Sequence, residues 1–329
     1  MLDLSRIWYR DRLTFTTYLL LPFSWLFRFI AYWRRFCYRV GIFKVFHFDV
    51  PVIVVGNITV GGTGKTPFVI WLAKVLRDSG YHPGIVSRGY GGKHHATPHL
   101  VTPESNPIDV GDEAVLLARL SGAPVVIAVD RVASVNFLLL HEKCDVVITD
   151  DGLQHYRLGR DIEIVIVDGK RNFGNYCVLP AGPLREPIRR LNNVDFVITN
   201  EGIAVAKWGM TLKPSHYVNV VSSVELDLSH FAGQTVHAVA AIGHPERFFT
   251  ALTNIGVDVI PHAFPDHYQY QSSDLIFFPT YPVVMTAKDA VKCEKFTNED
   301  LWYLATETIV SDALKESILT RLQKTRNKS

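Results

Sequence analysis

The feature that most constrains this chain is a glycine-rich segment that ends in a lysine and a threonine. It consists of Thr59, Val60, Gly61, Gly62, Thr63, Gly64, Lys65 and Thr66. An apolar run at 51–55 precedes it, and a helical pattern at 65–79 follows. In such strand–loop–helix segments the backbone N–H groups bind phosphates, the lysine reaches the outer phosphates, and the last hydroxyl binds Mg²⁺. The segment is therefore a predicted nucleotide-phosphate site.

One position of this loop departs from the usual pattern. Thr59 stands where the first glycine is expected, so the entry to the loop should differ from that of an ordinary GTPase. A glycine-rich turn that only packs against its neighbours is the alternative. The strand before the loop and the helix after it favour phosphate binding.

A pair of carboxylates supplies the acidic partner that such a loop needs for its metal. Asp150 and Asp151 follow the apolar run at 145–149, and the carboxyl ends of strands face the ligand crevice in open α/β sheets. We expect Thr66, Asp150 and Asp151 to hold Mg²⁺. Glu113 is expected either to support the same metal or to support Asp112, and a solvated acidic turn is the alternative for the pair.

The order of apolar runs predicts an α/β fold. Continuous apolar strands that alternate with helices are typical of a parallel sheet covered on both faces. A second, looser alternation begins near residue 235. The sequence thus predicts a P-loop-type sheet domain at 41–205, a linker at 206–232 and a smaller α/β domain at 233–329. The strands are expected at 51–55, 84–87, 123–129, 145–149, 163–167, 195–199, 235–242, 257–260, 282–286 and 302–306, with further helices near 113–120, 246–254 and 312–324.

Composition excludes several other classes of protein. With 329 residues and 48% hydrophobic content the chain has material for two cores, and its net charge of +2 gives no reason to expect nucleic acid. The four cysteines lie far apart, without the spacing of a zinc site or a disulfide framework. A reducing cytoplasm is the expected compartment.

The first 40 residues contain an apolar stretch that favours a membrane-associating helix. Residues 13–27 carry no charge, whereas Pro22 and Arg28 interrupt the longer segment 13–33. Spanning a bilayer takes about 20 apolar residues, so partial or interfacial insertion fits better. No small-residue cleavage site follows, which argues against a signal peptide. A core helix of a soluble protein is the alternative, and arginines at both ends give no orientation.

Two other classes of P-loop protein lack their signatures here. No Asn/Thr-Lys-x-Asp sequence follows a strand, and Thr286-Ala287-Lys288-Asp289 misses that guanine-reading spacing. A second P-loop and an ABC-type signature are also missing from the sequence. GTPase and transport ATPase are therefore disfavoured, although a fold alone does not decide function.

Several distinctive blocks follow one another along nearly the whole chain. They lie at 54–57, 60–67, 87–92 (Ser-Arg-Gly-Tyr-Gly-Gly), 111–113 (Gly-Asp-Glu), 150–155 (Asp-Asp-Gly-Leu-Gln-His), 179–186, 242–249 (Ile-Gly-His-Pro-Glu-Arg-Phe-Phe) and 266–268 (Asp-His-Tyr). As a set these blocks are specific, and with them the chain resembles the tetraacyldisaccharide 4′-kinase family of lipid A biosynthesis.

The resemblance implies transfer of the ATP γ-phosphate to the 4′-hydroxyl of tetraacyldisaccharide 1-phosphate, which gives the lipid IVA precursor used in lipopolysaccharide biosynthesis. It also implies a location on the cytoplasmic face of the inner membrane of a Gram-negative bacterium. The expected cofactors are ATP and Mg²⁺, and the expected partners are the lipid substrate and the membrane surface, with no obligate protein partner.

The family's catalytic positions carry over onto Asp112 as base, with His267 as its helper. Among the neighbouring residues, Arg185 is expected at the substrate's 1-phosphate or at ATP, and Gln154 and His155 near the same site. One position departs from the family: Ala287 stands where a glutamate is common, which removes any role assigned to that carboxylate.

Elementary chemistry supports some of these roles but leaves alternatives. A sugar hydroxyl is a poor nucleophile at neutral pH, so a carboxylate that accepts its proton assists the transfer. Asp112 follows a glycine at the start of the predicted helix 113–120, where a capping role is the alternative. The pairs Lys170/Arg171 and Arg189/Arg190 are basic clusters whose alternative is a solvated face.

Two other functions remain open from the residues alone. One is a soluble P-loop kinase for a small metabolite, which predicts no partition to membranes. The other is a membrane-attached nucleotide-driven switch, which predicts hydrolysis stimulated by a protein partner and no phosphorylated lipid.

Overall fold

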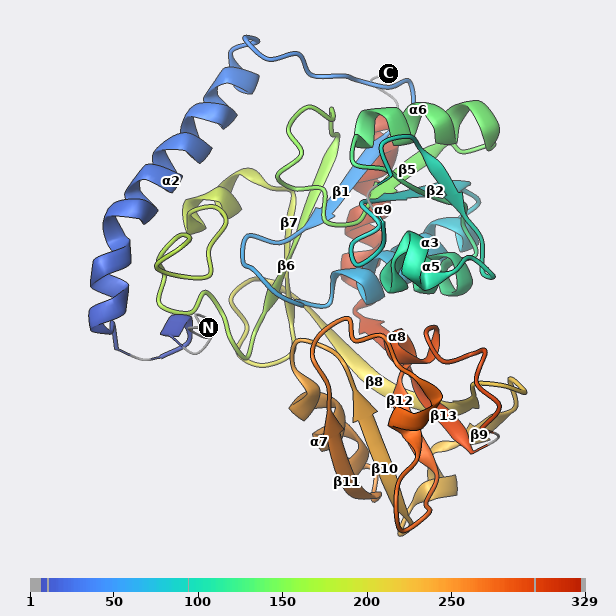
Figure 1. The fold of residues 1–329 in the computed structure, drawn as a ribbon. Coiled ribbons are helices and arrows are strands. Elements are labelled where there is room, and N and C mark those ends of the chain that lie inside the picture. Colours follow the sequence, from blue (N-terminus) through green and yellow to red (C-terminus); the bar gives the residue numbers. More distant parts are fainter. Residues whose placement is uncertain (1–6, 11, 94, 299, 327–329) are drawn as a thin grey trace.

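A single mixed sheet runs through the whole molecule. The computed structural model describes residues 7–10, 12–93, 95–298 and 300–326. Within these residues thirteen strands join edge to edge, and Figure 1 shows the result as two halves, with β1, β6 and β7 in one and β10 to β12 in the other. The order is β11-β10-β12-β13-β8-β7-β6-β1-β5-β2-β4-β3, with β9 paired to β8 alone.

The first half confirms the six predicted strands. They pair in parallel, and β3 adds an antiparallel edge. All five residues of β1 are buried, as continuous apolar strands covered on both faces require. The strands are β1 (Val52–Gly56), β2 (Pro83–Ser87), β3 (His99–Val101), β4 (Val125–Ile127), β5 (Val146–Thr149), β6 (Ile162–Asp168) and β7 (Phe196–Asn200).

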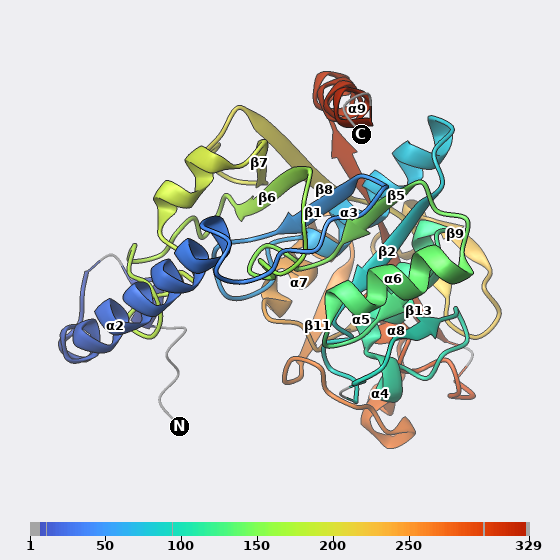
Figure 2. The ribbon, with the colours of Figure 1, turned by 90° about the horizontal axis from the view of Figure 1, so that it is seen from above.

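Helices cover both faces of this half. One apolar core joins α3 (Lys65–Asp78), α5 (Asp112–Ser121) and α9 (Asp312–Arg326) to one face of the sheet. The other core contains α6 (Arg131–His141), and Figure 2 shows α6 and α9 well apart on the two sides of the strands. The short helix α4 (Pro107–Val110) adds Val110 to the first core, and η1 (Ile188–Asn193) packs Ile188 against the second.

The second half has its own smaller core. Its parallel strands are β10 (Thr235–Ala240), β11 (Asp258–Ala263), β12 (Val283–Thr286) and the first part of β13 (Leu301–Val310). Phe231, Phe249 and Leu252 are among the side chains buried between this sheet and its helices. The helices are α7 (Pro245–Asn254) and α8 (Ala287–Ala290), with the 3-10 turns η2 (Leu228–Phe231) and η3 (Ser272–Leu275).

The segment expected to be a linker is part of the sheet, which corrects the sequence-based expectation for 206–232. It contains β8 (Trp208–Asn219), β9 (Glu225–Asp227) and η2. β8 pairs in parallel with β7 over three residues and antiparallel with β13 from Trp302 to Val310. Pro214 argues against a strand in the sequence, because proline is rare inside strands except at bulges. The structure has such an irregularity beside Pro214, where the register of β8 against β13 shifts between Ala305 and Thr306.

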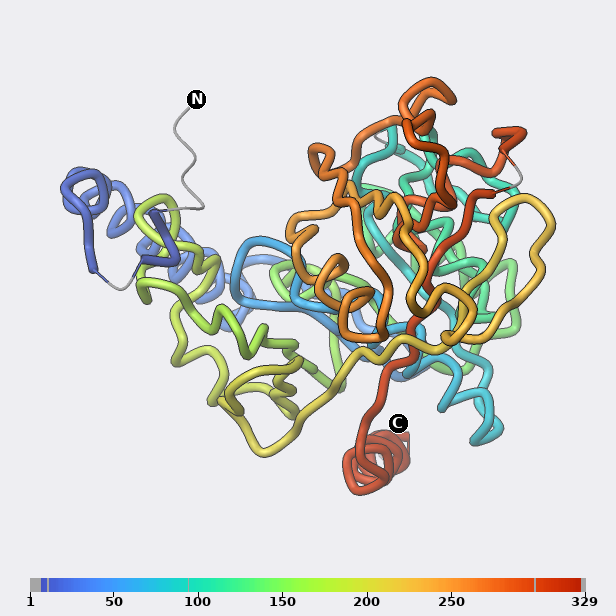
Figure 3. Tube along the Cα trace, turned by 90° about the horizontal axis from the view of Figure 1, so that it is seen from below, coloured from blue at the N-terminus to red at the C-terminus, as the bar shows by residue number. Residues whose placement is uncertain are grey.

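The C-terminal helix also crosses the expected domain boundary. Leu314, Ile318 and Leu322 of α9 are buried in the core of the first half. Figure 3 shows the chain leaving the second half through β13 to reach this helix. The last part of the region 233–329 therefore packs on the P-loop half.

A helix of 25 residues, α2 (Phe15–Arg39), occupies the apolar N-terminal segment. In Figures 1 and 2 it lies on the flank of the first half, beside the chain between β6 and β7. The Ser24 hydroxyl donates to the Val178 carbonyl and accepts from the Ala181 N–H, both at 2.9 Å. Within the described part of the chain, no helix has both the length and the apolar character needed to cross a bilayer.

Candidate nucleotide and phosphate-transfer site

The glycine-rich loop lies between β1 and α3, as predicted. Gly61 and Gly64 have φ of +104° and +91°, a region that favours glycine. A Cβ on Gly64 would lie 2.4 Å from Asn200 Nδ2, and this amide donates to the Thr63 carbonyl at 3.0 Å. Asn200, at the end of β7, thus supports the loop from behind, and the sequence analysis did not single it out.

The unusual entry of the loop has a structural reason. Thr59 is buried and forms an isolated antiparallel bridge with Leu184, and the Val60 N–H donates to the Pro183 carbonyl at 2.8 Å. The entry is therefore extended and paired with the segment that carries Arg185. A side chain with a preference for extended structure suits this position better than glycine does.

Thr66 and Asp150 meet at the start of α3. The Thr66 hydroxyl donates to Asp150 Oδ2 at 3.1 Å, whereas the buried Oδ1 has no hydrogen-bond partner among the described residues. Burial, with the charge of Glu113, raises the pKa of Asp150 to about 7. A buried carboxylate with an unsatisfied oxygen beside a threonine hydroxyl is suited to a bound cation.

Magnesium fits this pair of ligands. No group of three His, Cys, Asp or Glu side chains able to hold a metal occurs in the described residues. Mg²⁺ in kinase and ATPase sites is commonly bound by one or two protein oxygens, substrate phosphates and waters. Thr66 and Asp150 would hold the ion in that way.

Asp151 faces cations rather than Thr66. Its Oδ1 lies 3.6 Å from Lys65 Nζ, and Arg185 Nη1 donates to both carboxylate oxygens at 3.1 and 3.0 Å. Burial would raise the pKa of Asp151, but the charges of Lys65 and Arg185 hold it below its usual range. A metal-binding role for Asp151 stays a prediction, and what the structure places here is a carboxylate that joins Lys65 to Arg185.

Gln154 and His155 lie in the same region, but they are held differently. The Gln154 amide donates to Glu186 Oε1 at 2.9 Å and to the Asn57 carbonyl at 3.0 Å, and its oxygen lies 3.4 Å from Arg185 Nη1. His155 Nε2 is buried without a partner among the described residues. Burial, with the charge of Arg131, lowers the pKa of His155 to about 4, so its ring is neutral at physiological pH.

Asp112 and His267 form a pair that joins the two halves of the molecule. Asp112 begins α5 and is only 3% exposed, whereas His267 follows β11 in a left-handed conformation with φ of +60°. His267 Nδ1 lies 3.1 and 3.0 Å from the two Asp112 oxygens. Tyr90, from the Ser-Arg-Gly-Tyr-Gly-Gly block, packs its ring edge-on against the His267 ring.

The two members of this pair shift each other's ionisation in opposite directions. The hydrogen bond to Asp112 raises the pKa of His267. Burial would raise the pKa of Asp112, but the His267 hydrogen bond and the charges of Lys288 and Lys292 lower it. The aspartate is therefore an anion at neutral pH with a fixed hydrogen-bond donor behind it.

Two lysines that the sequence analysis did not propose complete the surroundings of this pair. Lys288 Nζ lies 3.0 Å from Glu113 Oε1 and 3.3 Å from His267 Nε2. Lys292 Nζ lies 3.9 Å from Asp112 and 2.7 Å from Asp289. Glu113 thus forms an ion pair with Lys288, and its charge also acts on Asp150. The sequence signal for these lysines was the segment 286–292, which the sequence analysis considered only as a failed guanine-reading motif and for Ala287.

Arg131 is a further cation that sequence reasoning missed. It begins α6, is buried, and donates from Nη1 to the Ala128 carbonyl at 2.7 Å. Burial lowers its pKa to about 10, and the charges of Asp151 and Asp150 oppose this shift. Its position just after β4, at the carboxyl edge of the sheet, was the available signal.

This fold and site define a class: a P-loop nucleotide-binding protein whose phosphate loop and Thr66–Asp150 contact lie at the ends of parallel strands, with a buried Asp112–His267 pair between the two halves. Comparison with known proteins narrows the class. The family model described as tetraacyldisaccharide-1-P 4′-kinase matches residues 16–323, so the chain belongs to that family.

Individual relatives agree with this assignment. The chain is 48% identical to the tetraacyldisaccharide 4′-kinase of Ruthia magnifica, covering 93% of this chain and 97% of that one. For the protein of the same name from Nitrosococcus oceani the identity is 46%, covering 98% and 95%. A solved structure, LpxK from Aquifex aeolicus in complex with ATP, matches with a TM-score of 0.80 and 30% identity over 93% of this chain and 99% of that one.

Proposed function

We propose that this protein transfers the terminal phosphate of ATP to the 4′-hydroxyl of tetraacyldisaccharide 1-phosphate, with Mg²⁺ as cofactor, and thereby makes the lipid IVA precursor of lipid A. The observation that carries the proposal is the buried Asp112–His267 pair, in which Asp112 begins α5, the helix next to the P-loop helix α3, and His267 comes from the other half. A P-loop binds phosphates in many proteins, but an anionic carboxylate with a fixed donor is suited to take a proton from an alcohol.

The phosphate donor would be held by the P-loop. Its backbone N–H groups and Lys65 bind the phosphates, and Thr66 with Asp150 hold Mg²⁺, which when bound supplies positive charge to the phosphate oxygens. Asp151 keeps the Lys65 ammonium in place from the other side. Three cations, Lys65, Arg131 and Arg185, lie around the aspartate pair.

Asp112 would act as the base. As the substrate hydroxyl oxygen attacks the γ-phosphorus, its proton passes to Asp112, the bond from phosphorus to the bridging oxygen breaks, and ADP leaves. His267 orients the carboxylate through Nδ1–H and stays hydrogen-bonded as the carboxyl group forms. Lys288 fixes the opposite nitrogen of the ring and Glu113.

Arg185, Gln154 and His155 would meet the phosphorylated sugar headgroup. Arg185 is partly exposed and already positioned by Asp151, so its free N–H groups are available to an anion. The neutral His155 ring carries an unsatisfied buried nitrogen, which suits a hydrogen bond from or to a sugar hydroxyl.

The acyl chains and the membrane would meet α2. This helix presents a large apolar surface, and its exposed side chains include Phe15, Leu19, Phe23, Trp25, Leu26, Phe29, Ile30, Tyr32 and Trp33. Exposed apolar surface of this extent on a helix with flanking arginines is typical of an interfacial anchor. We place the protein at the cytoplasmic face of the bacterial inner membrane, as a peripheral or partly inserted enzyme.

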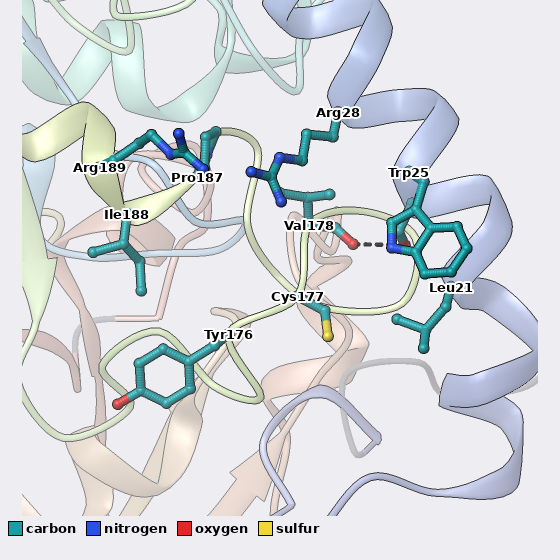
Figure 4. A pocket seen from close by; sticks show the side chains of 10 residues that line it. Leu21, Trp25, Arg28, Tyr176, Cys177, Val178, Pro187, Ile188 and Arg189 are labelled. Carbon is teal, nitrogen blue, oxygen red and sulfur yellow. Dashed lines mark hydrogen bonds between the residues drawn. The ribbon is translucent and has the colours of Figure 1, made fainter.

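A hollow between α2 and the chain before η1 is the best candidate for the substrate's apolar part. It measures about 320 Å³ and is lined by Leu21, Trp25 and Val178. Arg28 and Arg189 extend toward each other across it, as Figure 4 shows. Apolar walls with a cationic rim suit an acylated phosphosugar.

A lipid-product assay tests the proposal. Purified protein is incubated with γ-labelled ATP, Mg²⁺ and tetraacyldisaccharide 1-phosphate in detergent micelles, and lipids are separated by thin-layer chromatography. A labelled bisphosphorylated lipid that is lost in Lys65→Ala supports the kinase. ATP hydrolysis without a labelled lipid contradicts it and favours a nucleotide-driven switch.

A further inference from the structure

Arg171 lies at the open side of the P-loop. It follows β6, next to Lys170, and a Cβ placed on Gly61 would be 3.3 Å from its Nη1. Gly61 belongs to the part of the loop whose backbone N–H groups turn toward phosphates. The guanidinium is therefore within reach of an anion bound in the loop, and none of the roles described above uses it.

The charge of Arg171 is not neutralised by a neighbouring carboxylate. The obvious candidate, the buried Asp168, accepts from Arg247 Nη2 at 2.7 Å on both oxygens. Arg171 uses only its backbone N–H toward Asp168, at 3.2 Å. Among the described residues its side chain forms no ion pair, so a half-buried guanidinium is left with free donors.

Two neutral groups hold this guanidinium in place. The Tyr9 ring lies under it, with 3.8 Å from Arg171 Cζ to the ring centroid. On another side Arg171 Nη1 contacts His244 Nε2. Because arginine only donates, Nε2 must accept, so the His244 ring is neutral; burial and the charges of Arg171 and Arg247 lower its pKa accordingly.

These contacts connect three distant parts of the chain. Tyr9 belongs to the N-terminal segment before α2, which is fixed by Trp8: its indole donates to the Pro180 carbonyl at 3.0 Å, and its carbonyl accepts from the Asn175 N–H at 2.8 Å. His244 caps α7 in the second half. These contacts fix the orientation of the Arg171 side chain, and among the described residues no carboxylate forms an ion pair with it.

We propose that Arg171 binds the β- and γ-phosphates of the nucleotide from the open side of the P-loop, with Tyr9 and His244 as the groups that position it. This inference rests on the proposed use of ATP. A planar guanidinium donates to two phosphate oxygens at once, and that of Arg171 lies beside Gly61 of the loop. Arg247 takes up the charge of Asp168 and so leaves Arg171 free for the nucleotide.

The proposal makes the N-terminal segment a determinant of nucleotide affinity. Tyr9 lies six residues before Phe15, the first residue of α2, so the platform beneath the guanidinium adjoins the helix that we place at the membrane. Loss of the Tyr9 ring should therefore weaken ATP binding even though Tyr9 is distant in sequence from every motif of the site.

Isothermal titration of the full-length protein with MgATP and MgADP tests this. We expect Arg171→Gln to weaken both affinities by about 10- to 100-fold, the range of a charge-assisted hydrogen bond, and Arg171→Lys by less because a lysine keeps the charge without the fork. Tyr9→Leu should weaken them by about 2- to 5-fold, the range of one partly exposed cation–π contact. Lys170→Gln is the matched control, because Lys170 precedes Arg171 in the chain but forms an ion pair with Glu201, and this variant should bind both nucleotides like wild type.

A purely structural role for Arg171 predicts a different pattern. If the residue only ties Tyr9 to His244, Arg171→Gln lowers the melting temperature while nucleotide affinity stays within 2-fold of wild type, and that result overturns the proposal. If Arg171→Gln does not fold, the Lys variant is judged by the same criterion. A wild-type protein that binds ATP yet labels no lipid contradicts the kinase function and leaves the test of Arg171 intact.

Discussion

Removing His267 should move the acid limb of the pH–rate profile to higher pH. His267 donates to Asp112 at 3.0 Å in a site where the aspartate is 3% exposed. A hydrogen bond to a charged group contributes about 1.5–3 kcal/mol, and about 1.4 kcal/mol corresponds to a tenfold change in rate. If the transition state of the His267→Ala variant loses the full stabilisation that this hydrogen bond provides, kcat falls by about 10- to 150-fold.

The direction of the pH shift follows from the same contact. Burial raises the pKa of Asp112, and the His267 hydrogen bond is the first of the effects that lower it. Without the histidine the carboxylate takes up a proton at higher pH, so more alkaline conditions are needed to keep the base ionised. His267→Asn places an amide donor near the position of Nδ1, and we expect it to recover part of the loss.

The assay is initial-rate phosphorylation of the lipid from pH 5 to 9 at saturating ATP. His82→Ala is the control, because His82 is exposed and its bonds to Asp145 come from its backbone N–H and carbonyl. A His267→Ala enzyme with kcat within 2-fold of wild type and an unmoved acid limb would refute the reasoning.

The same variant should also lose the part of its stability that depends on protonated His267. Because its folded pKa is raised above 6.5, that part is fully present below pH 6.5 and disappears as pH rises through the folded value.

Three further outcomes are expected. Lys65→Ala should lower kcat/KM for ATP by at least about 100-fold with an unchanged melting temperature, measured by the lipid assay and by calorimetry, because it removes the cation at the transferred phosphate. Asp150→Asn should raise the Mg²⁺ concentration for half-maximal rate by about 10-fold or more, and an unchanged Mg²⁺ titration would exclude Asp150 as a ligand. The double change Phe23→Ser with Trp33→Ser should release the protein from anionic vesicles in a flotation assay while leaving ATP affinity unaltered; retention on vesicles would argue against α2 as the anchor.

The fold was predictable wherever the sequence pattern is locally unambiguous. Residues 52–56 are buried on both faces and carry apolar side chains at nearly every position, so the strand is plain from the sequence. β8 was not predicted because Lys213 and Pro214 interrupt it. The alternation of exposed with buried or partly buried side chains before the proline spans only about six residues. α9 could be predicted as a helix, but its packing on the first half depends on the path of β13, which no local pattern contains.

The site divides in the same way. The P-loop and Asp150 lie in segments whose order of strand, loop and helix predicts their positions. The Asp112–His267 pair joins residues 155 apart in sequence, so only resemblance to a family suggested it. Lys288 and Arg131 are basic residues in ordinary surroundings along the chain, and Arg171 was noted only as one of a basic pair. Their roles can be inferred only when their burial and contacts are known.

The bulged connection between the halves has a consequence for how the active site assembles. Between the three residues of β8 that pair with β7 and the four residues of β13 that pair with β12, the halves are joined by a ribbon of two strands, with the bulge at Ala305 and Thr306. Two-stranded ribbons twist more readily than wide sheets, and a bulge concentrates bending at one point. If the angle between the halves changes, the ribbon would bend while its hydrogen bonds stay intact. The same bending would change the distance between His267 and Asp112. The length of the Asp112–His267 hydrogen bond would therefore change with the curvature of this strand pair, and amides of the ribbon should stay protected from hydrogen exchange even while the site opens.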